Sequence, residues 1–591
     1  MADTMQGLRR TCLCGEVTLE MGEVVVGGFT QRVRDKGSLI FIDLRDKSGI
    51  VQLVFDETTE KSVFEKAESV RSEYVLLAKG TVRARESVNT EIKTGGIEIV
   101  VTELRILSKA QTPPFEIVSN TKTNEELRLK YRYLDLRREP LQKNLMMRHE
   151  IAKAAREYFY ANGFTEIETP MMIKSTPEGA RDYIVPSRIH NGKFYALPQS
   201  PQMYKQLLMI AGMDRYIQLA RCFRDEDLRA DRQPEFTQID LEMSFVDVDD
   251  ILECLEGFVK HLYKTVLNVD IPTPLPRLTY DEAMTRYGSD KPDTRFGMEI
   301  TDISDIVKDC GFSVFKDAVA NGGSVRGIVA KGAAAKLTRK EIDKQTEFVR
   351  GIGANGLAYV RWVDDAPNCS FAKFMGEGEL EAILRALGCE KGDVALIVAD
   401  KDKVTLPVLG ALRLKIAKQL DIIPEGWNFL WIVEFPFFEY DEESGEWLAM
   451  HHPFTMPLDE CIPYLDTDKA RVRAKCYDLV LNGIELSSGS IRITDPELQQ
   501  HMFEMLGMTD EEINAKFGFL VDAYKYGAPP HGGAGIGLDR LAMLMCGCDS
   551  LRDVTAFPKV QNASELMSEA PSTVSEEQLK ELGIAITNSE E

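Results

Sequence analysis

Alternating hydrophobic and polar residues mark the first hundred positions of the chain as a region of short β-strands. Five such runs predict strands at residues 23–30, 38–44, 51–55, 74–82 and 97–101, and a helical pattern occupies residues 62–69. Five strands at this spacing, with one helix between the third and the fourth, are typical of an OB-fold barrel. Residues 1–107 are therefore predicted to form such a domain, and the Pro- and charge-rich residues 108–138 a hinge.

Helical periodicity begins after this hinge. Pro140 is expected to open a long amphipathic helix that closes at Asn162-Gly163, and an alternating strand follows from Phe164 to Thr169. Further helices are predicted after Pro201 and over residues 248–267. A helix that leads directly into a strand is typical of the start of a new domain.

Two hairpins are predicted from strand alternation. Residues 221–240 form strands on both sides of a charged tip, and Asn482-Gly483 is the preferred two-residue type I′ turn. The second turn is expected to pair Leu481 with Ile484, Val480 with Glu485, and Asp478 with Ser487. This register places Asp478 and Glu485 on one face of the hairpin.

Residues 295–415 have a different pattern, in which helices at 340–350 and 379–387 alternate with strands at 326–330, 358–362 and 393–398. They predict a separate α+β lobe inserted into a larger domain made of residues 139–294 and 416–560, with 561–591 as a C-terminal extension. The predicted fold class is therefore α+β multidomain, with an N-terminal barrel, a domain built on an antiparallel sheet, and an inserted lobe.

Composition narrows the range of functions. The 591-residue chain has a formal net charge of −23, which argues against nonspecific coating of nucleic acid, because such binding depends on Lys and Arg. The chain has no 18-residue apolar run and no signal-peptide pattern at its start, so a cytoplasmic protein without membrane contact is expected. Its eleven scattered cysteines are expected to be reduced thiols rather than zinc ligands.

Two stretches have the composition of phosphate sites. Arg221 and Arg224 precede the charged tip of the first hairpin, and a strand can present an arginine rigidly to a phosphate. The glycine-rich residues 531–540 let a backbone approach a ligand, with Arg540 at the start of a helix. Taken singly, a solvated hairpin and a tightly packed glycine run explain these stretches equally well. Asp478 and Glu485 together suit Mg²⁺ that also carries nucleotide phosphates, although an acidic edge facing solvent fits the same pattern.

In the predicted barrel, basic residues surround an aromatic residue and an amide that are expected to be exposed, Phe41 and Gln52. The basic residues are Arg32, Arg34, Lys36, Arg45 and Lys47. This combination stacks and reads single-stranded bases. The alternation alone favours Phe41 as a core residue.

These motifs together resemble those of the class II aminoacyl-tRNA synthetases. Residues 163–170 resemble motif 1, Phe223 to Glu226 motif 2, and Gly535 to Arg540 motif 3. The resemblance is greatest to the bacterial aspartyl-tRNA synthetases, runs over nearly the whole chain, and extends to the inserted GAD domain of that family. It implies a homodimer that uses ATP and Mg²⁺ to activate L-aspartate and transfers the aspartyl group to the 3′ end of tRNA-Asp. Whether tRNA-Asn is also charged, and what the inserted lobe does, stay open.

The resemblance also implies residue roles. Arg224, Glu226 and Arg540 are expected to be catalytic. The aspartate pocket is expected to comprise Glu178 on a closing loop, Ser200, Gln202, Lys205, Arg224, Gln238, Asp240, His451 or His452, and Arg492. The ATP site is expected to comprise Arg224, Asp225, Glu226, Gln233, Phe236, Glu485, Gly537, Leu538, Asp539 and Arg540. Asp478 and Glu485 are expected to hold the metal, and Arg34, Phe41, Gln52 and Glu86 to contact the anticodon.

Two alternatives compete with this hypothesis. One is an asparaginyl- or lysyl-tRNA synthetase of the same subclass; lysine is disfavoured because Lys205 and Arg492 would repel it. The other is a tRNA-binding protein without chemistry, and the presence of Arg224, Glu485 and Arg540 argues against it. No P-loop motif occurs, and the late glycine run lacks the acidic residue of a Rossmann unit.

Overall fold

The computed structural model describes residues 2–176, 180–363, 365–441 and 444–587. The chain divides into two compact units, which are described separately. The first comprises residues 1–149, 227–234 and 542–578, and the second comprises residues 150–226, 235–541 and 579–591. None of the helices in the described ranges combines the length and apolar character needed to span a bilayer.

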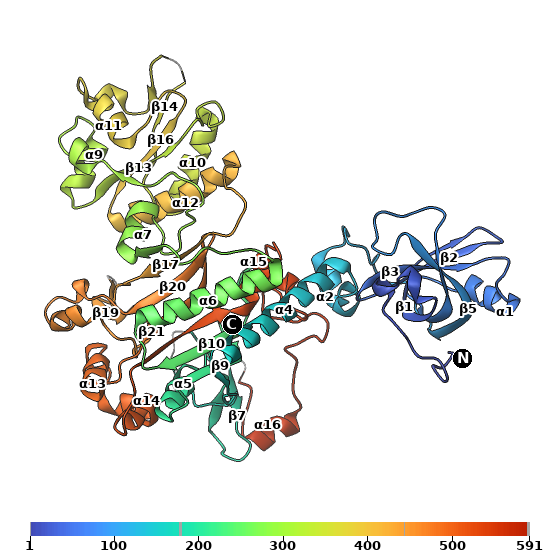
Figure 1. The fold of residues 1–591 in the computed structure, drawn as a ribbon. Helices are drawn as coiled ribbons and strands as arrows, with labels where there is room; N and C mark the ends of the chain where they lie inside the picture. Colours follow the sequence, from blue (N-terminus) through green and yellow to red (C-terminus); the bar gives the residue numbers. More distant parts are fainter. Residues whose placement is uncertain (1, 177–179, 364, 442–443, 588–591) are drawn as a thin grey trace. The chain divides into compact units, whose positions relative to one another are not determined.

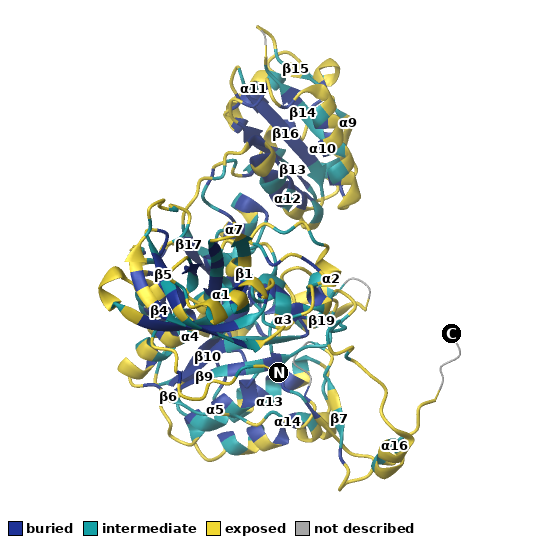
Figure 2. Cartoon of the chain, turned by 90° about the vertical axis from the view of Figure 1, so that its right-hand side faces the viewer, coloured by how far each residue is buried: buried dark blue, intermediate teal, exposed yellow. Residues whose placement is uncertain are grey.

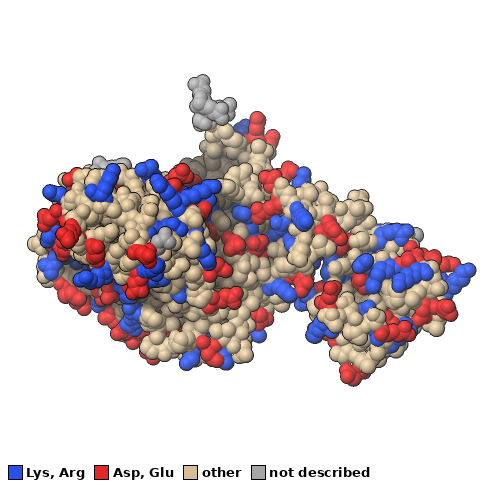
Figure 3. All heavy atoms as spheres, turned by 90° about the horizontal axis from the view of Figure 1, so that it is seen from above, with Lys and Arg blue, Asp and Glu red and all other residues tan. Residues whose placement is uncertain are grey.

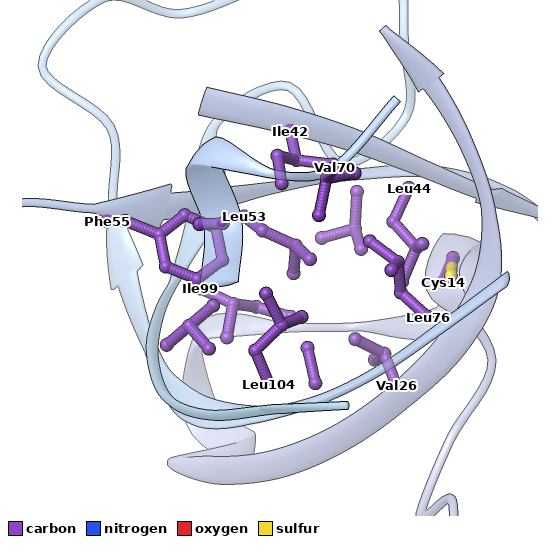
Figure 4. Close-up of a cluster of buried hydrophobic side chains, with 14 of the residues drawn as sticks. Cys14, Val26, Ile42, Leu44, Leu53, Phe55, Val70, Leu76, Ile99 and Leu104 are labelled. Atoms are coloured by element: carbon purple, nitrogen blue, oxygen red, sulfur yellow. The ribbon is translucent and has the colours of Figure 1, made fainter. Parts of the chain in front are cut away.

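The first unit begins with the predicted barrel. Its five strands close in the order β1-β2-β3-β5-β4, with β3 and β5 parallel and the other described pairs antiparallel. The strands are β1 (Glu23–Asp35), β2 (Ile40–Asp46), β3 (Gly49–Phe55), β4 (Val75–Ala84) and β5 (Ile97–Ser108), with α1 (Lys61–Glu68) between β3 and β4. Inward-facing residues such as Ile42, Leu53, Leu76 and Ile99 fill its interior (Figure 4). The predicted OB-fold is confirmed, although β1 and β5 are longer than their patterns indicated.

The predicted hinge contains two short helices that its charged sequence did not predict, α2 (Glu125–Lys130) and α3 (Arg132–Asp135). Buried Arg132 pairs with Asp135 at 2.8 Å and donates hydrogen bonds to main-chain carbonyls of residues 552, 555 and 556. Arg137 pairs with Glu73 of the barrel at 2.8 Å and lies 4.0 Å above the ring of Phe29. Residues 132 and 137 therefore tie the predicted hinge to residues 552–556 and to the barrel.

The second unit is built on an eight-stranded sheet in the order β11-β17-β20-β21-β22-β10-β9-β6, mostly antiparallel and parallel only at its two edge pairs (Figure 1). Its strands are β6 (Thr165–Glu166), β9 (Arg215–Phe223), β10 (Glu235–Ser244), β11 (Arg277–Thr279), β17 (Phe429–Val433), β20 (Cys476–Leu481), β21 (Ile484–Ile491) and β22 (His531–Gly537). Both predicted hairpins are present, as β9–β10 and β20–β21. The strand predicted for residues 164–169 is reduced to β6.

Helices and smaller sheets accompany this large sheet, whose central strands are buried (Figure 2). The helices are α5 (Gln202–Ile210), α6 (Val248–Leu267), α7 (Tyr280–Tyr287), α13 (Pro496–Met505) and α14 (Asp510–Tyr524). Three further helices contain residues of both units: α4 (Glu139–Ala161), α15 (Leu538–Met545) and α16 (Glu576–Leu582). Two-stranded sheets pair β7 (Ile184–Pro186) with β8 (Phe194–Ala196) and β18 (Phe438–Asp441) with β19 (Glu446–Ala449).

The inserted lobe has its own five-stranded sheet in the order β12-β13-β16-β14-β15. Its elements are β12 (Thr301–Asp302), α8 (Ser304–Val307), α9 (Ser313–Ala320), β13 (Ser324–Ala330), α10 (Arg339–Gly351), β14 (Ala358–Arg361), β15 (Asn368–Cys369), α11 (Glu379–Leu387), β16 (Val394–Asp400) and α12 (Asp402–Leu420). At its base α12 packs closely on α7: a Cβ on Gly288 would lie 2.0 Å from the carbonyl oxygen of Leu406.

Candidate active site

Strand register builds one polar face on the large sheet. Directly opposite residues of an antiparallel pair project from the same face, so Gln238, Asp240 and Glu242 of β10 share theirs with the glycines opposite them in β22, residues 537, 535 and 533. These glycines leave the polar side chains uncrowded. A Cβ on Gly533 would lie 2.1 Å from the Glu242 carboxylate, so a larger residue there is incompatible with this arrangement.

The same face continues onto β21 and β20. Ser488 lies opposite Gly535, and Asp478 lies opposite Ser488, which brings Asp478 onto the polar face. The predicted pairing of Asp478 with Ser487 is wrong, because a bulge between Leu479 and Val480 shifts the register by one residue. Nearer the turn, the predicted partners of Leu481 and Val480 are confirmed.

Four buried charges occupy the centre of this face. Lys205, from α5, lies 2.9 Å from Asp240 and 3.2 Å from Glu242, and Arg492 donates to both oxygens of Glu242 at 2.9 and 3.1 Å. All four side chains are at most 3% exposed, and their charges cancel. We call Lys205, Asp240, Glu242 and Arg492 the buried quartet. Such a set is stable only when each charge is paired.

The two acids of the quartet respond differently to burial. Desolvation opposes ionisation of Glu242, but the charges of Arg492 and Lys205 outweigh it and lower the pKa of Glu242 to about 2. Desolvation raises the pKa of Asp240 above its ordinary value, despite the opposing charge of Lys205. Oδ2 of Asp240 is buried without a hydrogen-bond partner, which suits it to accept one from a ligand.

Glu242 was missed by the sequence analysis. It lies two residues beyond Asp240 on a strand, and side chains two residues apart on a strand project from the same face. That signal was available, but nothing in the sequence indicates that an acid from β10 meets a cation 250 residues further along.

The two histidines occupy different environments. His452 Nε2 accepts a hydrogen bond from Arg492 at 2.7 Å, which places His452, rather than His451, against the quartet. The ring of His451 meets Phe435 edge to face, and its Nε2 is buried without a partner. Burial lowers the pKa of His451 to about 4.

This lowered pKa predicts a pH-dependent stability. Unfolded His451 binds a proton below about pH 6.5, whereas the folded form stays neutral to about pH 4. The contribution of neutral His451 to the free energy of unfolding is therefore fully present above pH 6.5 and is lost as the pH falls toward 4. We expect His451→Asn to reduce the fall in melting temperature over this interval, measured by calorimetry at several pH values. Parallel curves for the variant and the wild type would contradict the assignment.

The predicted phosphate-binding residues lie on the same unit. Arg224 lies 5.2 Å from the ring centroid of Phe236, and its Nε is buried without a partner. Arg540 donates to the main-chain carbonyl of Glu485 at 2.7 Å, and Asp539 accepts a hydrogen bond from the main chain of Thr237. The hydrogen bond between Thr237 and Asp539 joins two motif-like stretches that lie 302 residues apart in the chain.

The expected metal ligands come from the β20–β21 hairpin. Desolvation and the nearby charge of Glu485 raise the pKa of Asp478 well above its ordinary value, and its Oδ1 is buried without a partner. Within the described residues, no group of three or more potential metal-binding side chains assembles. Two carboxylates nevertheless fit Mg²⁺, which is commonly held by one or two protein carboxylates together with substrate phosphates.

Other predicted site residues have simpler outcomes. Ser200 and Gln202 lie at the start of α5, near Lys205, and Nε2 of Gln202 is buried without a partner. Asp225 and Glu226 are half-buried at the end of the first hairpin. Gln233 belongs to the first unit, where its side-chain amide pairs with the main chain of Lys559. Glu178 lies outside the described residues.

The barrel corrects two expectations. Gln52 is 2% exposed, not accessible, because Arg34 donates to its Oε1 at 2.8 Å and its Nε2 donates to Glu98 at 2.6 Å. Arg45 does not join the basic group around Phe41, since it is buried in an ion pair with Glu73. Phe41 is half-buried with the Arg34 guanidinium 5.4 Å from its ring centroid, and Glu86 is exposed after β4.

Known proteins share this architecture. Residues 124–561 match the family described as "tRNA synthetases class II (D, K and N)", and residues 24–107 match "OB-fold nucleic acid binding domain". The chain therefore belongs to the class II aminoacyl-tRNA synthetases. Within them it belongs to the bacterial aspartate–tRNA ligases. It is 59% identical to "Aspartate--tRNA ligase" of Ruminiclostridium cellulolyticum, over 99% of this chain and 100% of that protein.

Two further comparisons add detail. "Aspartate--tRNA(Asp/Asn) ligase" of Caldanaerobacter subterraneus is 58% identical over 99% of this chain and all of that protein. The crystal structure of asparaginyl-tRNA synthetase from Pyrococcus horikoshii, complexed with asparaginyl-adenylate, aligns with a TM-score of 0.58 over 93% of this chain and 98% of that one. At 20% identity, this structural likeness concerns the fold alone.

Proposed function

We propose that the protein activates L-aspartate with ATP, forming aspartyl-adenylate and pyrophosphate, and then transfers the aspartyl group to the 3′ end of tRNA-Asp. The observation that carries the assignment of substrate is the buried quartet. It holds two cations, Lys205 and Arg492, on a polar sheet face where glycines make room for the side chains of Gln238 and Glu242. Full-length identity to aspartate–tRNA ligases supports the same reaction.

Selection of aspartate would rest on charge. The side-chain carboxylate of the substrate would pair with Lys205 and Arg492, while Asp240 would accept a hydrogen bond from the substrate ammonium group through its unpartnered oxygen. Asparagine has a neutral amide in place of the carboxylate, so it would offer no negative charge to Lys205 and Arg492. Leaving buried groups unpaired is what gives such sites strong discrimination.

Activation would depend mainly on positioning and charge neutralisation. A substrate carboxylate oxygen attacks the α-phosphorus in line, the new P–O bond forms, and pyrophosphate leaves with the bonding electrons. Arg224 would neutralise the α-phosphate, Phe236 would stack on adenine, and Arg540 would bind the pyrophosphate side. Asp478 and Glu485 would hold Mg²⁺, which when bound supplies positive charge to the phosphates.

The decisive test is amino-acid-dependent exchange of pyrophosphate into ATP, measured with aspartate, asparagine and lysine in parallel. We expect exchange with aspartate alone. Exchange with asparagine in preference to aspartate would overturn the proposed pocket, and exchange with none of the three would overturn the proposed reaction.

Charging of tRNA-Asn is a second candidate activity, because one relative at 58% identity carries the name "Aspartate--tRNA(Asp/Asn) ligase". Aminoacylation with purified tRNA-Asp and tRNA-Asn would distinguish the two.

We also propose that the chain is divided into parts with separate roles. These parts are residues 1–107, 108–138, 139–294 with 416–560, 295–415 and 561–591. A cytoplasmic homodimer formed through α4 and β6 is proposed as well.

Anticodon recognition is proposed for the barrel face that carries Arg34 and Phe41. Positive and negative side chains are interspersed over the face shown in Figure 3, which is consistent with local rather than general contact with nucleic acid. Arg34, Gln52 and Glu98 form a fixed polar network beside the ring of Phe41. Such a network can pre-orient groups for base recognition.

Phe41→Ala is expected to lower kcat/KM for tRNA by about tenfold or more, because stacking of a base on an aromatic ring contributes about 1–3 kcal/mol. Pyrophosphate exchange, which needs no tRNA, should stay within twofold of the wild type. Phe41→Tyr retains the ring and serves as the control, with near-normal charging. An equal loss in charging and exchange would refute the role of the barrel.

A further inference from the structure

The loop of residues 288–298 joins the large sheet to the inserted lobe, and it also borders the expected metal ligands. It begins at the C-terminus of α7 and leads to β12. None of its residues belongs to the motif-like stretches of the sequence. Its position therefore raises the question of what its charged residues, Asp290 and Lys291, do beside the hairpin that carries Asp478 and Glu485.

The loop is held firmly against the turn of that hairpin. Asp293 is 2% exposed and pairs with Arg295 at 2.7 Å, and a Cβ on Gly483 would lie 3.0 Å from the Cβ of Asp293. Thr294 is hydrogen-bonded to Asn428 at 3.0 Å. Asp293 is two residues from Lys291 in the loop, and Gly483 is two residues from Glu485 in the hairpin. The contact between them therefore fixes the loop close to both charged residues.

The lobe side of the loop is clamped as well. Buried Arg413, from α12, donates to the main-chain carbonyls of residues 296, 297 and 298, at 2.8 to 3.2 Å. Its guanidinium also lies 4.1 Å from the ring centroid of Phe296. A segment fixed at both ends presents the side chains between them in a narrow range of positions.

Lys291 extends from this fixed segment into a group of acids. Its Nζ lies 3.1 Å from Asp290 and 4.0 Å from Glu485, and its side chain is 44% exposed. Asp478 belongs to the same group, and its buried oxygen without a partner indicates a site that is completed by a ligand.

We propose that Lys291 is a third cation of the nucleotide site, positioned to bind the pyrophosphate portion of ATP. The inference rests on the proposed nucleotide site. Arg540 donates to the main-chain carbonyl of Glu485, and Lys291 approaches the carboxylate of the same residue, so both cations lie beside one expected metal ligand. With Glu485 engaged as a ligand of Mg²⁺, Lys291 would retain Asp290 as a partner and would be available to the phosphates.

Binding measurements without aspartate test this proposal, because no reaction occurs and the readout is not activity. Mg·ATP would be titrated by calorimetry into the full-length wild type and the variants Lys291→Met and Lys291→Arg. We expect the dissociation constant to rise about tenfold in Lys291→Met and to stay within threefold in Lys291→Arg. Lys264→Met is the matched control, since Lys264 is an exposed lysine that pairs with Asp270 at 2.9 Å.

A second ligand separates a phosphate contact from a structural role. A non-hydrolysable aspartyl-adenylate analogue has no β- or γ-phosphate, so its affinity should not change in Lys291→Met. Unchanged affinity for Mg·ATP in this variant would overturn the proposal, and so would an equal loss of affinity for the analogue. If the wild type itself binds no Mg·ATP, this result refutes the proposed nucleotide site as a whole, independently of the role of Lys291.

Discussion

Replacing Arg224 by Met is expected to lower the rate of aspartate-dependent pyrophosphate exchange about a thousandfold. The reason is that the guanidinium would meet charge that develops on the α-phosphate during attack. Loss of one such preorganised donor costs about 3–4 kcal/mol. The buried Nε of Arg224 has no partner, and the nearby ring of Phe236 limits how the side chain can move. The effect should appear mainly in kcat.

Arg221→Met provides the matched control for this prediction. Arg221 lies on β9, three residues before Arg224, and projects from the sheet face opposite to that of Gln238; there it pairs with Glu235 at 2.6 Å. This half-buried surface pair contributes little to stability, and its loss should change exchange by less than threefold. Similar losses in both variants would mean that the hairpin is merely destabilised and that Arg224 has no specific role.

Local sequence signals predicted the elements that are held by local interactions. The helix α6 begins and ends where its pattern indicated, because Asp247 caps its first turn and Asn268 adopts a left-handed conformation after its last. The β20–β21 turn formed at Asn482-Gly483, where both residues have positive φ. Capping and turn chemistry depend on neighbours in the sequence, so they can be read from it.

Features that depend on distant partners were not predicted. The bulge beside Leu479 does not change the alternation of hydrophobic and polar residues in β20, so the sequence does not reveal it. It shifts only the pairs that lie farther from the turn than Val480. Gln52 is buried because Arg34 and Glu98 come to it from two other strands. In the candidate site, the sequence indicated the cations Lys205 and Arg492 but not Glu242, the acid that pairs with both.

Replacing Arg492 by Met is expected to lower kcat/KM for aspartate about a thousandfold and to lower the melting temperature by several degrees. Without Arg492 the quartet retains Lys205 against two carboxylates, a net charge of −1 in a region with almost no exposure to solvent. Breaking a buried ion pair in this way costs about 3–5 kcal/mol. The KM for ATP should change little, because Arg492 contacts no predicted nucleotide-binding residue in the described part of the chain.

Adding Glu242→Gln separates the two effects. The double variant keeps the pair of Lys205 and Asp240, so the net charge returns to zero and the melting temperature should recover in part. Aspartate activation should not recover, because one of the two cations proposed to bind the substrate carboxylate is still missing. Scanning calorimetry and pyrophosphate exchange would be measured on all four proteins of the cycle. If activation returned together with stability, the quartet would support the fold without selecting aspartate.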